Sequence, residues 1–545
     1  MESLYKLPAS ALDPKSDELD SVLQRLITAA ELARSNQEPR WTCLKDMYMQ
    51  EAGKGIGRSP FNGWDARPTS LVSSRVDRLA EAVFTGLTKS EPYCQASPLD
   101  GGQQKADDLE TGIQAVVQRS GFDQAFRIAL RSAALYSPGI LWVRVTDQGV
   151  KTETVSPDRF VALPAYERNV CRGHLYGHRV DMTLWEAEEM REKGGWRKEI
   201  EFAAFTQSGA LSSKDGASEG QIASENDWQT VAIYHLLVKL QIGKRAGWWS
   251  IIYHRDQNKW LKVEEYALDR PWYVPVRLHF EPNLFWPETS PANRLQGMMH
   301  DHTTMQAIIV GGAMFKSVGV LVGGPSLKDG FQTFQPGQLL PNPGGTPVSA
   351  VFPPISIEEA LAAKGAIEQD ADAALGLSKL GTAQELDNAT ATETSILKGS
   401  QDMTLDAYAQ HAAEALEEVF ALVQHICTVH ASAVQEHAKW LGVEFYNNLT
   451  QIVEWKASGR AADNAPSVVN QKLAALVQMS QNPNSILDPQ KVEEAAIRGL
   501  QIPVSDIEDL KKENQDAVGQ APGMVEFGDG QALQGLPEDQ TQAYS

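Results

Sequence analysis

Two histidine pairs have the spacing in this chain that comes nearest to a metal site. His300 and His302 are two residues apart, and His174 and His178 are four apart. Alternate residues of a helix point to different faces, and the glycines directly before His174 and His178 disfavour a helix there, so neither pair can grip one ion. We therefore expect surface or packing roles for these histidines, with no resident metal and no cofactor.

A glycine-rich stretch and the many carboxylates are the other candidates for chemistry. Residues 53–57 (Gly-Lys-Gly-Ile-Gly) follow no strand and lack the Lys-Ser/Thr pair of a phosphate-binding loop, so they predict a surface turn. The chain contains neither an H-E-x-x-H zinc motif nor a G-x-S-x-G nucleophile motif. We expect a protein that is not an enzyme. The 70 acidic residues leave a nuclease-type carboxylate cluster open as an alternative, although no spacing favours one.

Composition limits the class of protein. With 545 residues and 42% apolar content, the chain can form two to four domains with real cores. The net charge of −21 argues against an extended basic face that grips nucleic acid, and it is also what a soluble protein of no special function has. Four cysteines without a C-x-x-C pair indicate a reducing cytoplasm. We expect neither a signal peptide nor a membrane span.

The N-terminal half reads as helices followed by a sheet. Apolar residues recur at helical spacing in the first part, and alternating apolar residues then indicate a strand meander. A stretch rich in Ser, Gly and Ala at 207–227 predicts a loop. Helices are predicted at 17–35, after Thr69 or Ser70, at 104–119, 122–136 and 183–193, and strands at 140–145, 155–163, 178–181, 229–240, 248–255 and 260–266.

The stretch 285–432 has the most distinctive order of elements. A helical seam predicts a first helix over 291–317, and the Gly/Pro-rich segment 318–355 predicts short strands joined by tight turns. Ser356 with Glu359 marks the start of a second helix that ends near Gly376. Thr390 with Glu393 marks a third helix, which continues to about residue 432 and would be about 60 Å long.

Two features of this stretch allow more than one interpretation. Gly311 and Gly312 are costly inside a helix, so they indicate either a close approach or bend, or a helix that ends at Val310. The insert has too little core to be stable alone, so its apolar residues must pack on neighbouring copies or back on the chain. The loop after Gly376 either connects two helices or has a function of its own.

This order resembles bacteriophage portal proteins, the head-to-tail connectors of tailed phages. Local sequence is most similar to the portals of short-tailed phages at residues 271–276 (Pro-Trp-Tyr-Val-Pro-Val), 318–322 (Val-Gly-Val-Leu-Val) and 390–393 (Thr-Ala-Thr-Glu). The resemblance implies an α+β, mainly helical fold with the portal's parts. These would be a wing (1–290), first stem helix (291–317), clip (318–355), second stem helix (356–376), tunnel loop (377–390), long wing helix (391–432), crown (433–518) and disordered tail (519–545).

The resemblance also implies two sets of site residues. The tunnel loop would face DNA in the channel, and the clip would contact neighbouring subunits and dock the terminase or adaptor. The residues so assigned are Lys379, Thr382, Gln384, Glu385 and Asn388 in the tunnel loop, and Phe331, Phe334, Gln338, Leu339 and Leu340 in the clip.

The implied function is a ring, a dodecamer, at one capsid vertex through which double-stranded DNA is packaged and ejected without sequence specificity. Its implied partners are the major capsid protein, a scaffolding protein, the terminase large subunit and a tail adaptor. It would lie in the virion, and in the host cytoplasm during assembly. The alternatives are a DNA-packaging enzyme, either a terminase-type ATPase or a nuclease, and another head–tail adaptor ring.

Overall fold

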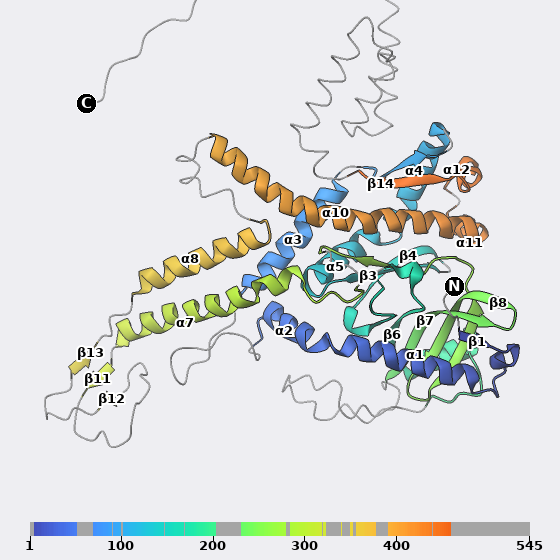
Figure 1. Cartoon of the computed structure of the whole chain (residues 1–545), viewed down its shortest axis with the longest axis horizontal. Coiled ribbons are helices and arrows are strands. Elements are labelled where there is room, and N and C mark those ends of the chain that lie inside the picture. Colours follow the sequence, from blue (N-terminus) through green and yellow to red (C-terminus); the bar gives the residue numbers. More distant parts are fainter. Residues whose placement is uncertain are drawn as a thin grey trace, which may run out of the picture. The chain divides into compact units, whose positions relative to one another are not determined.

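The chain folds as a mixture of helices and strands in the computed structural model (Figure 1). The α+β class expected from the sequence is therefore correct. The structure describes residues 5–51, 69–89, 91–99, 102–146, 148–167, 169–202, 230–279, 284–318, 320–322, 339–340, 349–351, 356–377, 391–438 and 440–458. The expected surface turn at 53–57 and the expected loop at 207–227 lie outside these residues.

A six-stranded sheet forms from the predicted meander and the N-terminal strand. β7 (Thr230–Ile242) is paired antiparallel with β6 and β8 and parallel with β1. Helix α1 (Glu18–Ser35), predicted at 17–35, buries its apolar face on this sheet. The other strands are β1 (Tyr5–Leu7), β5 (Phe160–Leu163), β6 (Leu175–Thr183), β8 (Arg245–His254) and β9 (Lys259–Glu265).

A second sheet has the order β10-β3-β4, with β3 (Gly139–Thr146) in the centre. β4 (Gly149–Val155) and β10 (Tyr273–Val276) flank it. The prediction of one strand over 155–163 is wrong, because β4 ends at Val155 and β5 starts at Phe160 in the other sheet. A 3₁₀ turn that begins at Pro157, which has no N–H for a ladder bond, separates the two strands.

Four long helices make the largest hydrophobic cluster, here called the helical core. Three were predicted in the N-terminal half, and Gly121, at φ +81°, makes the turn between the second and third. α2 (Glu38–Met49) was missed, and it contributes Leu44 and Met47 to this core. The four long helices are α3 (Leu71–Thr88), α4 (Gln103–Arg119), α5 (Phe122–Leu135) and α10 (Ala391–Val429).

Residues after α10 return to the helical core. α11 (Ala431–His437) and α12 (Val443–Asn448) lead to β14 (Val453–Ala457), which pairs antiparallel with β2 (Cys94–Pro98). Residues 433–458, grouped with the crown from the sequence, therefore pack with the N-terminal helices. The rest of the predicted crown and the predicted tail, residues 459–545, lie outside the described residues.

Helices α7 (Gln296–Val318) and α8 (Ile357–Ala374) lie side by side, with three very short strands at their far end (Figure 1). We call α7, these strands and α8 the hairpin. β11 (Val320–Val322) is central, parallel to β12 (Leu339–Leu340) and antiparallel to β13 (Ser349–Val351). α7 follows a 3₁₀ turn over Pro291–Leu295 and continues through Gly311 and Gly312, so the interpretation that the helix ends at Val310 is wrong.

Candidate functional site: the base of the hairpin

The base of the hairpin is held by a line of polar side chains along α8. Lys364, Glu368 and Asp372 are four residues apart, so they lie on one face of the helix. Each contacts a different partner on α7 or α3. We call these three residues and their partners the polar stripe.

Asp372 forms the lowest contact of the polar stripe. Its carboxylate is 5% exposed and lies 3.0 Å from Nε of Arg75 and 3.5 Å from Nη1 of Arg78, both on α3. Arg78 also donates to the carbonyl of Leu377, just after α8 (3.3 Å). A buried charge needs such partners, since removing one leaves an uncompensated ion in a low-dielectric site. These contacts fix the C-terminal end of α8 to the helical core.

His302 forms the middle contact. The side chain is 4% exposed, with Nδ1 2.8 Å from the Thr69 hydroxyl and Nε2 3.0 Å from a Glu368 oxygen. Thr69 lies just before α3, so the imidazole connects both hairpin helices to that helix. His300 is exposed, in agreement with the expectation that the two histidines face different ways.

The third contact lies further along the hairpin. Lys364 donates to the side-chain oxygen of Gln306 at 2.7 Å, which joins α8 to α7 without a partner from α3. Beside the polar stripe, apolar side chains at the base belong to the helical core: Leu295, Met299, Ala371 and Leu375. The base is therefore integrated into the core, whereas Val310, Met314 and Leu361 further out are 44–51% exposed.

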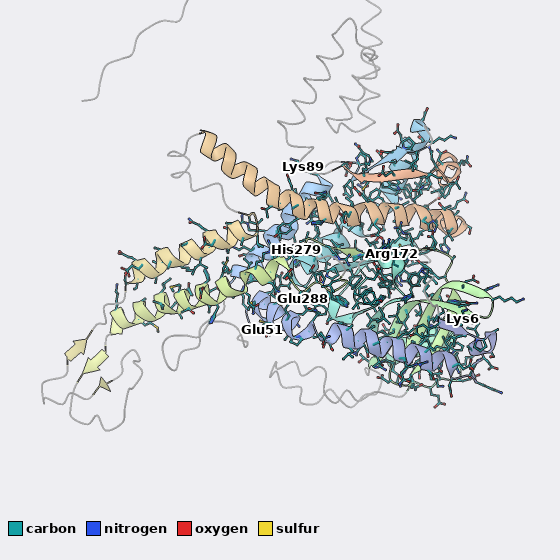
Figure 2. All side chains as sticks on the ribbon, viewed as in Figure 1. Lys6, Glu51, Lys89, Arg172, His279 and Glu288 are labelled. Atoms are coloured by element: carbon teal, nitrogen blue, oxygen red, sulfur yellow. The ribbon has the colours of Figure 1, made fainter. Side chains whose placement is uncertain are left out.

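The segment that leads into α7 is anchored separately. Arg40 of α2 donates to the carbonyls of Pro287 (2.9 Å) and of Glu288, which is labelled in Figure 2. The buried Ser290 hydroxyl donates to the carbonyl of Leu135 at the end of α5 (2.9 Å). Entry to and exit from the hairpin are thus tied to different helices of the core.

A cavity with a volume of about 620 Å³ lies beside α10. His425 lies there 3.2 Å from Asp269, and Gln424 donates to the carbonyls of Leu449 (3.1 Å) and Gln451 (2.9 Å). Burial raises the pKa of the Cys171 thiol at the edge of this cavity, so less of the nucleophilic thiolate is present at neutral pH. The polar groups that line this cavity, Gln424 above all, hold α10 to the segment before β14.

A second buried polar group lies between the two sheets. Nδ1 of His178 is 2.8 Å from the Tyr273 hydroxyl, and its ring contacts those of Trp142 and His235. Burial lowers the pKa of His178 to about 3 and that of His235 to about 4, so both are neutral in the folded protein. His174 and His178, considered as a pair from the sequence, have separate surroundings: His178 is a packing residue of β6.

Among the described residues, no three or more His, Cys, Asp or Glu side chains are grouped so that they could hold a metal ion. None of the helices in the described ranges is both long and apolar enough to span a membrane.

Most of the site residues predicted from the sequence lie outside the described residues. Leu339 and Leu340 form β12, and the other residues assigned to the clip or tunnel loop lie outside the described residues: Phe331, Phe334, Gln338, Lys379, Thr382, Gln384, Glu385 and Asn388. Sequence reasoning missed the polar stripe. Its signal is the four-residue spacing of Lys364, Glu368 and Asp372, but Arg75, the partner of Asp372, is almost 300 positions away.

Comparison with known proteins gives distant likenesses only. No family model matches the chain, and no curated protein matches its sequence. Among solved structures, it is similar to a chain in the neck of an empty gene transfer agent (GTA) particle, with 13% identity and a TM-score of 0.33 over 81% of this chain and 95% of that one. A chain in the virion of a native GTA particle has 13% identity and a TM-score of 0.30 over 82% and 98%.

Proposed function

We propose that this protein is a phage portal, a head-to-tail connector whose copies form a ring around a channel for double-stranded DNA. The observation that carries the proposal is the hairpin followed by α10. A helix leads to a small sheet, a second helix returns beside it, and a 39-residue helix follows. The portal family has this order of stem, clip, stem, tunnel loop and long helix.

The strands at the far end of the hairpin support assembly into a ring. β11, β12 and β13 have two or three residues each. A sheet of this size cannot bury enough apolar surface to be stable on its own. In a closed ring the same segment of neighbouring copies lies alongside, and those copies supply the missing contacts.

α10 supports an extended architecture. At 1.5 Å per residue its 39 residues span about 58 Å. Its C-terminal half is buried in the helical core, where Leu416, Val419, Phe420 and Val423 are 0% exposed. A helix of that length would cross the wing of a portal subunit from the channel side to the outer side.

Net charge fits a conduit for DNA. With 70 acidic and 49 basic residues, the chain repels phosphate more than it binds it.

The proposed role is passive in the chemical sense, since the protein would catalyse no reaction and bind no nucleotide. The clip would dock the terminase large subunit and later a tail adaptor, and the wing would contact the major capsid protein and the scaffolding protein. The protein would lie in the virion after assembly in the host cytoplasm.

Electron microscopy and mass photometry of the purified full chain test the proposal. We expect rings with a central channel and a mass near that of a dodecamer of 59.8 kDa copies. Rings without a channel wide enough for a DNA duplex would favour another adaptor. A monomer at every salt concentration, with ATPase or metal-dependent nuclease activity, would refute the portal function and support a packaging enzyme.

A further inference from the structure

The contact around His302 can accept two protonation states. The Glu368 carboxylate only accepts hydrogen bonds, so Nε2 of His302 carries the hydrogen that it donates across 3.0 Å. In the neutral ring Nδ1 accepts from the Thr69 hydroxyl at 2.8 Å. In the cationic ring Nδ1 donates, and the hydroxyl can turn to the Met299 sulfur at 3.4 Å. Proton uptake therefore changes the charge at the joint without first breaking its hydrogen bonds.

Charges of both signs face His302 from the two elements packed against it. From α8 these are Glu368, within hydrogen-bond distance, and Lys364, one turn away. From α3, Arg75 also repels a cationic ring. Asp372 is one turn beyond Glu368 but is already engaged by Arg75 and Arg78. Within α7, His300 and Asp301 are exposed. A cationic His302 ring would therefore lie near one carboxylate and two cations, with little contact with water.

We propose that the polar stripe is a proton-sensitive joint, in which protonation of His302 loosens the docking of the hairpin base on α3. The position of His302 suits this role. A titratable side chain that is 4% exposed connects three segments, namely the one before α3, α7 and α8. It lies at the base of a hairpin whose outer part is more exposed. The proposal concerns the chain itself and holds whether or not the portal function does.

The direction of the effect follows from linkage. Burial, the largest cause, and the nearby cations lower the pKa of His302 below its ordinary 6.5, while the Glu368 contact opposes them. The docked state therefore binds fewer protons than the undocked state, and the docking that is complete above pH 6.5 weakens as pH falls. The pKa of Glu368, held below 4.5 by His302 against the opposing effect of burial, changes nothing between pH 7.5 and 5.5.

Hydrogen–deuterium exchange of the full chain at pH 7.5 and pH 5.5 tests the joint. After correction for intrinsic rates, we expect exchange at the base of α7 and in the last two turns of α8 to rise at pH 5.5, by up to about tenfold for one linked proton. Amides of α4 and α5, two helices of the core that contain no histidine, serve as the internal reference. An equal rise in those helices would mean that the whole fold loosens and would refute a local joint, as would no rise or a fall at the joint.

Two variants separate the joint from ordinary packing. His302→Gln keeps hydrogen-bonding groups toward Thr69 and Glu368 but cannot titrate, so its exchange at the joint should be the same at both pH values. His300→Gln, the control on the exposed side of α7, should respond like the wild type. If His302→Gln raises exchange already at pH 7.5, the substitution itself disturbs the packing, and Thr69→Val is then the variant to compare with the wild type. That variant removes the hydroxyl that partners Nδ1 in both protonation states, and a buried N–H of the cation left unpaired costs more than an unpaired acceptor of the neutral ring. It should therefore increase the loosening at pH 5.5, and an unchanged response would overturn the proposal.

Discussion

Buried charged side chains decide where the hairpin can attach. Asp372 is 5% exposed and has two arginine partners on α3, whereas Asp370, two residues earlier on the same helix, is exposed. Two aspartates with the same helix propensity thus have different roles. The difference comes from α3, which supplies positive charge to one face of α8.

Replacing Asp372 should therefore destabilise the protein strongly. We expect Asp372→Ala to lower the free energy of unfolding by about 3–5 kcal/mol, because Arg75, whose side chain is mostly covered, is left without its carboxylate. Asp370→Ala should change it by less than about 0.5 kcal/mol. Urea denaturation followed by circular dichroism measures both variants. Similar values for the two would show that the ion pair contributes little.

The histidines between the two sheets make a separate prediction about acid. The pKa values of His178 (about 3) and His235 (about 4) lie below the ordinary 6.5, so the folded state binds fewer protons than the unfolded state. The contribution of these two histidines to the free energy of unfolding is fully present above pH 6.5. Below that pH it falls by about 1.4 kcal/mol per pH unit for each histidine.

Urea denaturation from pH 7 to pH 5 checks this slope. His178→Gln should remove up to about 1.4 kcal/mol per pH unit of it, besides any loss from the Tyr273 contact. Tyr273→Phe, which removes the same hydrogen bond but keeps the imidazole buried, is the matched control and should keep the wild-type slope. A slope that is unchanged in His178→Gln would mean that this histidine is not neutral in the fold.

At the scale of elements, close packing between α5 and β3 depends on a glycine. A Cβ at Gly139 would overlap the carbonyl of Ala129 on α5. Gly86, inside α3, has nothing within 4 Å of the same position. The two glycines thus have opposite consequences for substitution.

Alanine substitutions at these glycines should have opposite signs. We expect Gly139→Ala to destabilise the protein by about 1–3 kcal/mol, because backbone must move to admit the methyl group. Gly86→Ala should stabilise it by about 1 kcal/mol through helix propensity. Thermal unfolding of the two variants beside the wild type measures the pair. Equal shifts would show that α5 and β3 can separate at low cost.

At the scale of the whole molecule, different parts of each subunit would have different roles in the proposed ring. The hairpin and α10 would build the walls, and residues 377–390 would face DNA in the channel. Interfaces in such a ring are heterologous and closed by rotation, so each subunit offers two different surfaces. Assembly and DNA handling would then depend on different residues.

Deleting residues 379–388 tests that division. We expect rings of unchanged mass that package or retain less DNA, because the walls remain while the proposed DNA-facing loop is removed. Mass photometry and an in vitro packaging assay measure the two properties. A deletion of equal length in the C-terminal tail, 530–539, is the control. Loss of ring assembly in the first deletion would contradict the proposed roles.

Local pattern alone determined most of the secondary structure. The helices at 17–35, 104–119 and 122–136 and the strand meander appear where apolar periodicity predicted them, because an amphipathic element carries its own burial pattern. The capping residue Ser356 also accepts from the N–H of Glu359, as expected. The order of helix, strands and helix in the hairpin was likewise readable from residues 291–376.

Tertiary structure alone decided which distant segments meet. β14 pairs with β2 across more than 350 residues, and β1 joins β7 across more than 230. From the sequence His302 was expected to have a surface or packing role, and Asp372 had no assigned role; only the tertiary structure places Thr69 beside the first and α3 beside the second. Pairings of this kind depend on burial and charge contributed by both partners, whereas periodicity describes only one segment at a time.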